Sequence, residues 1–170
     1  AYLDVIAQTL AIAKDTGVFL LLTSNDTPDD GGYPAIANLG NSEFFPGYRN
    51  TAFLTTAGAD AAAEYWDDLL SGLVQRRAAF EAVLAWSILN EQWVFKKQPP
   101  LSLREGTVAG ADGKSYEMSS AGLRRRLVLA GVRHYIDTVA EAIRRHDPHG
   151  LVTMGFFAPQ FPNPTTIGGE

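Results

Sequence analysis

The sequence contains no cysteine, which excludes disulfide bonds and thiolate metal sites. It also has no excess of positive charge: 14 Lys and Arg face 19 Asp and Glu, and nucleic acids usually select a basic face. No apolar run approaches the roughly 18 residues of a membrane span. We therefore expect neither nucleic acid nor membrane as a partner, while the missing cysteines leave the compartment open, because many secreted proteins also lack them.

What is present is an apolar composition rich in aromatic residues. Hydrophobic residues make up 46% of the 170, with nine Phe, six Tyr and three Trp. Such a chain can bury a core and is not disordered, and its length suits one domain. It has no initiator Met and opens directly on the first predicted helix, so we expect that residue 1 is not the natural start. The absence of a signal peptide therefore says nothing about secretion.

Hydrophobic periodicity predicts three helices, and short apolar runs predict three strands. Gly17 suits the end of the first helix and Asp60 the N-cap of the second, while Pro148 stops the third. The continuous run Val18–Leu22 is typical of a strand buried on both faces. The predicted helices cover residues 2–14, 60–80 and 123–145, and the predicted strands cover 18–22, 82–89 and 151–157.

The alternation of helix and strand predicts an α/β fold with a parallel sheet. The helix-to-strand connections are short, but the strand-to-helix connections at 23–59 and 92–121 are long. Loops of such length are uncommon in compact domains unless they are functional. In a parallel sheet they all lie at the C-terminal end of the strands, where ligands bind in α/β folds. The sequence therefore predicts a site at that end, with Asn90 and Glu91 at the tip of the second strand.

The stretch WSILNEQW places a carboxylate straight after an apolar strand. Glu91 could be solvated there without any function. Asn90 beside it can donate two hydrogen bonds from its amide. Trp86 and Trp93 bracket the pair, and aromatic rings suit the apolar faces of sugars. These neighbours favour a carbohydrate site over a plain strand end.

WSILNE resembles the fourth-strand signature of the glycoside hydrolases that fold as (β/α)8 barrels, often called clan A, which include cellulases and mannanases. VFLLL followed by Thr23, Ser24 and Asn25 is similar to the third strand of that family. DTVAEAIRRHDPHGLVTMGF is similar to its fourth helix and fifth strand. The resemblance covers most of the chain apart from the two long loops. Gln92 stands where many members have proline.

The resemblance implies a retaining hydrolase of β-linked oligo- or polysaccharides, with no cofactor or metal. Glu91 would be the general acid/base, which must hold its proton until the glycosidic oxygen departs, and Asn90 would bind the hydroxyl next to the anomeric carbon. Residues 1–170 would form one partial TIM-barrel domain, about strands three to five. The nucleophile, a Glu after the seventh strand, would lie outside the chain, which alone would be inactive. Glu170 follows no strand signal and is not taken for it.

Two other interpretations stay open. A relative that keeps the barrel but only binds carbohydrate would have the same motif. A complete small α/β domain with an unrelated ligand is the third possibility. The resemblance is compatible with a secreted protein, and the oligomeric state is not determined by the sequence.

Further candidates surround the predicted site. Ser24 and Asn25 at the first strand tip, together with Trp93, are expected to contact substrate. Asp26, with Asp29 and Asp30, could line a sugar subsite or bind a cation, but such residues are also ordinary turn formers, and their spacing matches no EF-hand. The loop aromatics are expected either to carry sugar rings or to anchor their loops; they are Tyr33, Phe44, Phe45, Tyr48 and Tyr116. The histidines His134, His146 and His149 lack metal-ligand spacing, so we expect structural or surface roles for them.

Overall fold

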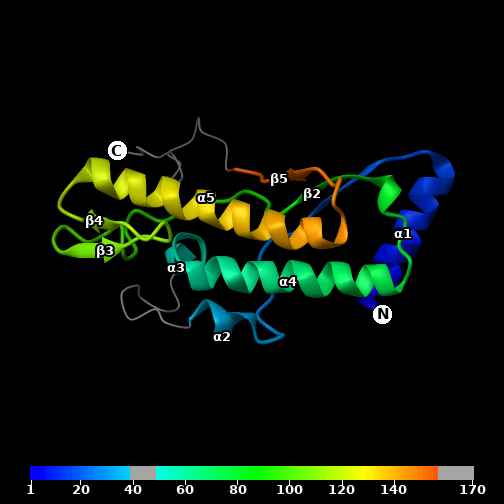
Figure 1. The fold of residues 1–170 in the computed structure, drawn as a ribbon, viewed down its shortest axis with the longest axis horizontal. Coiled ribbons are helices and arrows are strands. Elements are labelled where there is room, and N and C mark those ends of the chain that lie inside the picture. Colours follow the sequence, from blue (N-terminus) through cyan, green and yellow to red (C-terminus); the bar gives the residue numbers. More distant parts are fainter. Residues whose placement is uncertain (39–48, 157–170) are drawn as a thin grey trace.

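A computed structural model of the chain describes residues 1–38 and 49–156. It is a mixed α/β structure in which helices pack on a small parallel sheet, as the alternating pattern predicts (Figure 1). The helices are α1 (Tyr2–Thr16), α2 (Tyr33–Ala37), α3 (Arg49–Leu54), α4 (Thr56–Gln75), the 3-10 turn η1 (Phe80–Ala82) and α5 (Ala121–His146). The strands are β1 (Leu20–Thr23), β2 (Val83–Ser87), β3 (Thr107–Ala109), β4 (Ser115–Glu117) and β5 (Val152–Thr153).

The parallel sheet has the order β1-β2-β5, so strands that follow one another along the chain are neighbours in space. Trp86 in the central strand pairs with Leu22 on one side and with Val152 on the other. The register slips between Leu20 and Leu21, where β2 contributes an extra residue. The C-terminal ends of the three strands therefore meet at one edge of the sheet, as the prediction requires.

All the described helices that contact this sheet lie on one of its faces. The inward side chains Leu22, Trp86 and Val152 belong to the core formed with α4 and α5. Helix α1 packs through Leu10 onto Leu22 and Val83, which belong to the same core. Right-handed crossovers between sequential parallel strands put each connecting helix on the same side. Figure 1 shows α4 and α5 lying alongside each other, with β2 and β5 against them.

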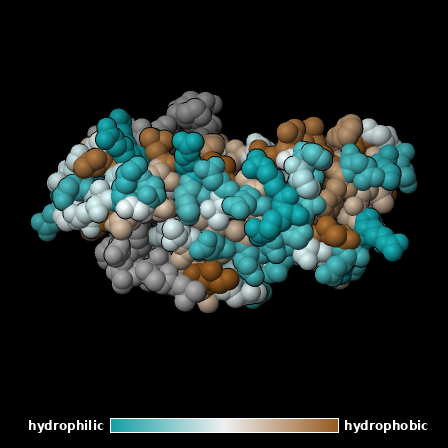
Figure 2. Space-filling model, viewed as in Figure 1, coloured by the Kyte–Doolittle hydropathy of each residue, from teal (hydrophilic) through white to brown (hydrophobic). Residues whose placement is uncertain are grey.

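The prediction that the first strand is buried on both faces is wrong. Leu21 and Leu84 are each 52% exposed, because no described element covers the face opposite the helices. Val18 and Phe19, at the start of the apolar run, are also exposed. Figure 2 shows hydrophobic surface along the edge where Figure 1 places the chain leading from α1 into β1. The strand is thus half-covered, although its sequence is apolar throughout.

The two predicted long loops contain regular structure. The described part of 23–59 includes α2 and α3, and 92–121 includes the antiparallel hairpin of β3 and β4. The helix expected to begin at Asp60 begins at Thr56, because the Thr55 side chain accepts a hydrogen bond from the Gly58 amide and caps it. Phe53 on α3 and Tyr116 on β4 pack into the core with α5, and α2 packs on α4. Packing rather than local periodicity therefore orders them.

The ends of the other long helices agree closely with the sequence. Gly17 ends α1 in the left-handed conformation at φ 70°, and the next amide, Val18, donates to the Ala13 carbonyl. Ser120 caps α5 by accepting from the Leu123 amide. Among the residues that the structure describes, no helix combines the length and apolar character needed to span a membrane.

Candidate functional site

Asn90 and Glu91 lie just beyond the C-terminal end of β2, the central strand, and both are exposed. The backbone amide of Asn90 donates to the backbone carbonyl of Ser24, at the end of β1, with an N–O distance of 2.8 Å. Two residues later, the backbone amide of Gln92 donates to the carbonyl of Gly155, beyond the end of β5, at 2.9 Å. The pair is therefore fixed between the ends of both neighbouring strands.

The pair lies in an irregularity of the ladder between β2 and β5. The amides of Ile88 and Gln92 donate to the carbonyls of Thr153 and Gly155. The chain thus advances four residues on the β2 side and two on the β5 side, whereas a regular parallel ladder advances equally on both. Extra residues of this kind form a bulge, which bends the strand and turns its side chains out of the ladder. Asn90 and Glu91 are residues of this bulge.

Glu91 has a left-handed backbone conformation, with φ 49°. Among the described residues, one other non-glycine residue has a positive φ, namely Arg77, which follows the end of α4 where this conformation is common. Glu91 does not end a helix, so its conformation is imposed by the strand ends around it. A left-handed residue with a side chain costs about 1–2 kcal/mol, and such strain is concentrated at functional sites.

The predicted contacts after β1 have different environments. Ser24 is buried, and its hydroxyl donates to the Asp26 carbonyl at 3.0 Å, so it stabilises its own loop. Asn25 beside it is exposed. Because the Ser24 carbonyl binds the Asn90 amide, Asn25 and the Asn90–Glu91 pair lie at the same edge of the sheet.

Arg49, which the sequence analysis does not single out, joins two predicted site residues. Its Nη1 lies 2.8 Å from Oδ2 of Asp26, and its guanidinium carbon lies 3.7 Å from the centre of the Trp93 ring. Its Nε also donates to the Trp93 carbonyl. One face of the Trp93 indole is therefore covered by a cation, which adds cation–π stabilisation. No spacing rule marks Arg49, because it lies in a turn-rich stretch far from Trp93 in sequence.

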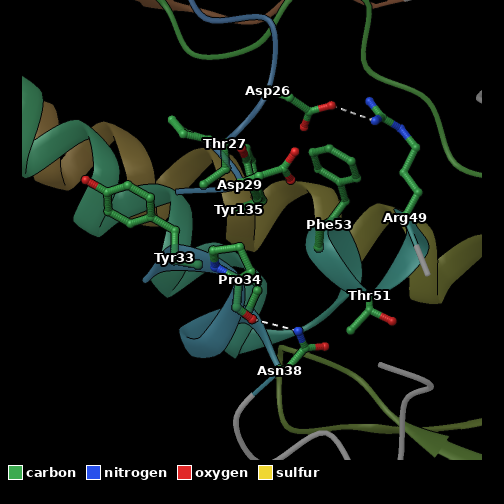
Figure 3. A pocket seen from close by; sticks show the side chains of 15 residues that line it. Asp26, Thr27, Asp29, Tyr33, Pro34, Asn38, Arg49, Thr51, Phe53 and Tyr135 are labelled. Atoms are coloured by element: carbon green, nitrogen blue, oxygen red, sulfur yellow. Dashed lines mark hydrogen bonds and ion pairs between the residues drawn. The ribbon is translucent and has the colours of Figure 1, made fainter. Parts of the chain in front are cut away.

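A cavity of about 230 Å³ opens next to this ion pair (Figure 3). Asp26 faces Arg49 on one side, and Asp29, Tyr33 and Tyr135 lie around the remaining wall. Burial, together with the hydrogen bond to Asp68, raises the pKa of Tyr33 to about 12. The cavity thus has a carboxylate rim and aromatic walls.

Asp26, Asp29 and Asp30 gain no support as a cation site. In the stretches 1–38 and 49–156, no group of three or more His, Asp or Glu side chains is placed to hold a metal ion. Asp26 instead forms the ion pair with Arg49, and Asp30 is exposed.

The prediction that two tryptophans bracket the Asn-Glu pair is wrong for Trp86. Its side chain is 0% exposed and packs edge-on against Phe80 and Trp66, at ring distances of 5.2 and 6.2 Å. Its Nε1 donates to Asp147 at 2.9 Å. Side chains alternate along a strand, and the register places Trp86 on the face that the helices cover. It therefore belongs to the core and cannot contact a ligand.

Tyr116 also lies in the core rather than in an open loop. It is 6% exposed on β4, and its hydroxyl donates to Asp112 at 2.8 Å. Burial, followed by this bond, raises its pKa. These contacts favour the anchoring role over the sugar-platform role. Of the other candidates, Phe44, Phe45, Tyr48 and Glu170 lie outside the described residues.

The three histidines have surroundings that fit structural or surface roles. His146 Nε2 lies 3.0 Å from Asp67, and His134 lies within reach of Thr138 on the same helix. His149 is exposed in the connection from α5 to β5, at the opposite end of the sheet from Glu91.

Asn50 is a second residue that sequence reasoning misses. It is fully buried at the start of α3, and its amide group donates to the carbonyls of Phe95 and Gln98 while its oxygen accepts from the Phe95 amide at 2.7 Å. It fixes the chain that follows Glu91 to α3. A single buried Asn has no periodic signature, so only the fold identifies it.

Comparisons with protein-family models, with curated proteins and with solved structures found no match for this chain. Its function is therefore inferred from the residues and the geometry at the ends of the strands.

Proposed function

We propose that this chain is part of a (β/α)8 glycoside hydrolase in which Glu91 is the general acid/base for retaining hydrolysis of β-linked saccharides. The proposal rests on one observation above all: the exposed Asn90–Glu91 pair lies in a bulge at the C-terminal end of the central strand of a parallel sheet. Catalytic side chains of barrel enzymes come from this end of the strands.

The arrangement of the layers supports the barrel part of the proposal. The strands are in sequential order, and their helices all lie on one face. Doubly wound sheets have helices on both faces, whereas barrels have them on the outside only. In the proposed barrel, the uncovered face with Leu21 and Leu84 would be the interior, which apolar side chains fill.

The proposed chemistry assigns one role to each residue of the pair. Asn90 donates a hydrogen bond to the hydroxyl next to the anomeric carbon. Glu91 gives its proton to the glycosidic oxygen as the bond to the anomeric carbon breaks, and it later takes a proton from the attacking water. A second carboxylate about 5–5.5 Å away, supplied by a later strand, forms and releases the covalent glycosyl intermediate.

The neighbouring residues would bind the rest of the substrate. Asn25 follows β1 and Trp93 follows β2, the strand beside it. We therefore assign these two residues to sugar units on either side of the cleaved bond. Arg49 fixes the Trp93 ring by stacking on it and fixes Asp26 by an ion pair. Ser24 and Tyr116 contribute less directly, because their hydroxyls bind protein groups.

The test compares the protein expressed from its intact gene with its Glu91→Gln variant on aryl β-glycosides. We expect kcat on substrates with poor leaving groups to fall by about 10²–10⁴-fold, the usual contribution of general acid/base catalysis. Activated leaving groups need little protonation, so their release should suffer less. Glu105→Gln, which changes an exposed glutamate of the same loop, is the matched control and should keep its activity. Unchanged turnover in Glu91→Gln would contradict the assignment, and saccharide binding without any hydrolysis by the wild type would favour a binding-only relative.

A further inference from the structure

We propose that Gly155 is a positioning residue for Glu91: it lets the chain beyond β5 approach the Asn90–Glu91 bulge closely enough to fix the direction of the carboxylate. The expected effect on catalysis rests on the proposed function, whereas the conformational effect does not. Sequence reasoning does not single out Gly155, because a glycine after a short strand is also an ordinary turn residue.

Gly155 is needed for space. A Cβ atom at this position would lie 3.1 Å from the Glu91 nitrogen, 3.2 Å from the Leu89 carbonyl oxygen and 3.6 Å from the Asn90 Cα. The first two distances are shorter than ordinary van der Waals contact, and the atoms are backbone, which no side-chain rotation can move aside. Any side chain at position 155 would therefore push on the bulge itself.

Gly155 also binds both ends of the bulge. Its amide donates to the Leu89 carbonyl at 2.8 Å, and its carbonyl accepts from the Gln92 amide at 2.9 Å. On the other side, Asn90 is bound to Ser24. Glu91 thus lies in a short segment whose backbone is held before and after it, and this explains how its left-handed φ of 49° is maintained.

The backbone sets the direction in which the Glu91 side chain leaves the bulge. Within the described residues this carboxylate forms no hydrogen bond or ion pair, in contrast to Asp26 and Asp67. A displacement of its backbone is therefore passed on to the side chain without correction. A misplacement of about 1 Å can cost about 100-fold in rate, so a shift of a few tenths of an ångström should cost several-fold to tenfold.

The first experiment compares Gly155→Ala with Gly150→Ala in the protein expressed from its intact gene. Gly150 is a matched control, since a Cβ there would also be crowded, 2.5 Å from Asp147 Oδ2, but at the opposite end of β5. We expect Gly155→Ala to lower kcat by several-fold to tenfold with KM changed less than about twofold. Gly150→Ala should change neither constant. Equal kcat for Gly155→Ala and wild type would overturn the inference.

The second experiment needs no activity. Urea midpoints are measured for Gly155→Ala, for Glu91→Gly and for the double variant, and the same set is made with Gly150→Ala. A glycine at position 91 lets the bulge adjust, so the drop in midpoint caused by Gly155→Ala should be at least halved in the Glu91→Gly background, with no such change for Gly150→Ala. Additive effects would overturn the inference.

If Gly155→Ala alone does not fold, recovery of folding by Glu91→Gly supports the inference and lack of recovery overturns it. A non-additive pair in a protein that hydrolyses no saccharide would refute the proposed function and support the role of Gly155.

Discussion

The backbone amide of Asn90 donates to the carbonyl of Ser24 at 2.8 Å, one residue out of step with the ladder between β1 and β2. The Ser24 amide bonds to the Ser87 carbonyl, so in a regular ladder the amide of residue 89 would be the donor to Ser24. The extra residue places Asn90 and Glu91 outside the sheet while both neighbouring strands hold their backbone. The candidate site is thus created by a local bulge in the strand pairing.

Glu91→Gly is expected to stabilise the protein by about 1 kcal/mol, because glycine adopts a positive φ without the steric cost of a side chain. Urea unfolding of the wild type and the variant measures this difference. Arg77→Gly relieves the same conformation at the end of α4 and should stabilise by a similar amount. If only Arg77→Gly stabilises, Glu91 is not strained.

Asn50→Ala is expected to destabilise by about 2–4 kcal/mol, because it leaves several partly buried backbone groups of the loop after Glu91 without partners. Chemical denaturation gives the value. Asn25→Ala, which removes an exposed asparagine, should stay within about 0.5 kcal/mol of the wild type. A small loss for Asn50→Ala would mean that this loop does not depend on α3.

Asp67 should give the protein an acid-sensitive contribution to stability. Hydrogen bonds from Arg145 and then His146 lower the pKa of this carboxyl below its usual value. A group with a lowered folded-state pKa stabilises above its unfolded pKa of about 3.9 and loses that contribution as the pH falls through the folded value. Between pH 5 and 3 the urea midpoint of the wild type should therefore fall more steeply than that of Asp67→Asn. Asp60→Asn, at an exposed position of the same helix, should follow the wild type, and parallel curves for Asp67→Asn would contradict the prediction.

The uncovered sheet face should make the 170-residue chain associate. Leu21 and Leu84 expose apolar side chains on this face, and unpaired strand edges invite further pairing. The double variant Leu21→Thr, Leu84→Thr keeps the preference for strand and should lower light scattering and dye binding. Val74→Thr, at a similarly exposed apolar position on α4, should leave both unchanged. Equal scattering by the wild type, the double variant and Val74→Thr would mean that the chain associates through another surface.

The elements with a long, regular pattern were predictable. The helix expected at 123–145 spans Ala121–His146, and the run expected as a strand at 82–89 contains Val83–Ser87. The start of α4 was predicted wrongly, because Thr55 and Asp60 are both good caps and only the actual hydrogen bond with Gly58 decides between them. The helices and hairpin inside the long loops were missed because they are ordered by contacts with α4 and α5, which local sequence does not encode.

By itself the sequence determined the order of the three long helices and the three parallel strands, the edge at which these strands end, and the position of Asn90 and Glu91 on that edge. These follow from periodicity and from the geometry common to parallel sheets. Only the tertiary structure decided that Trp86 is buried, that Arg49 stacks on Trp93, and that Glu91 is left-handed in a bulge beside Gly155. The reason is physical: which way a side chain faces, and how closely two backbones approach, depend on register and contacts between segments far apart in the chain.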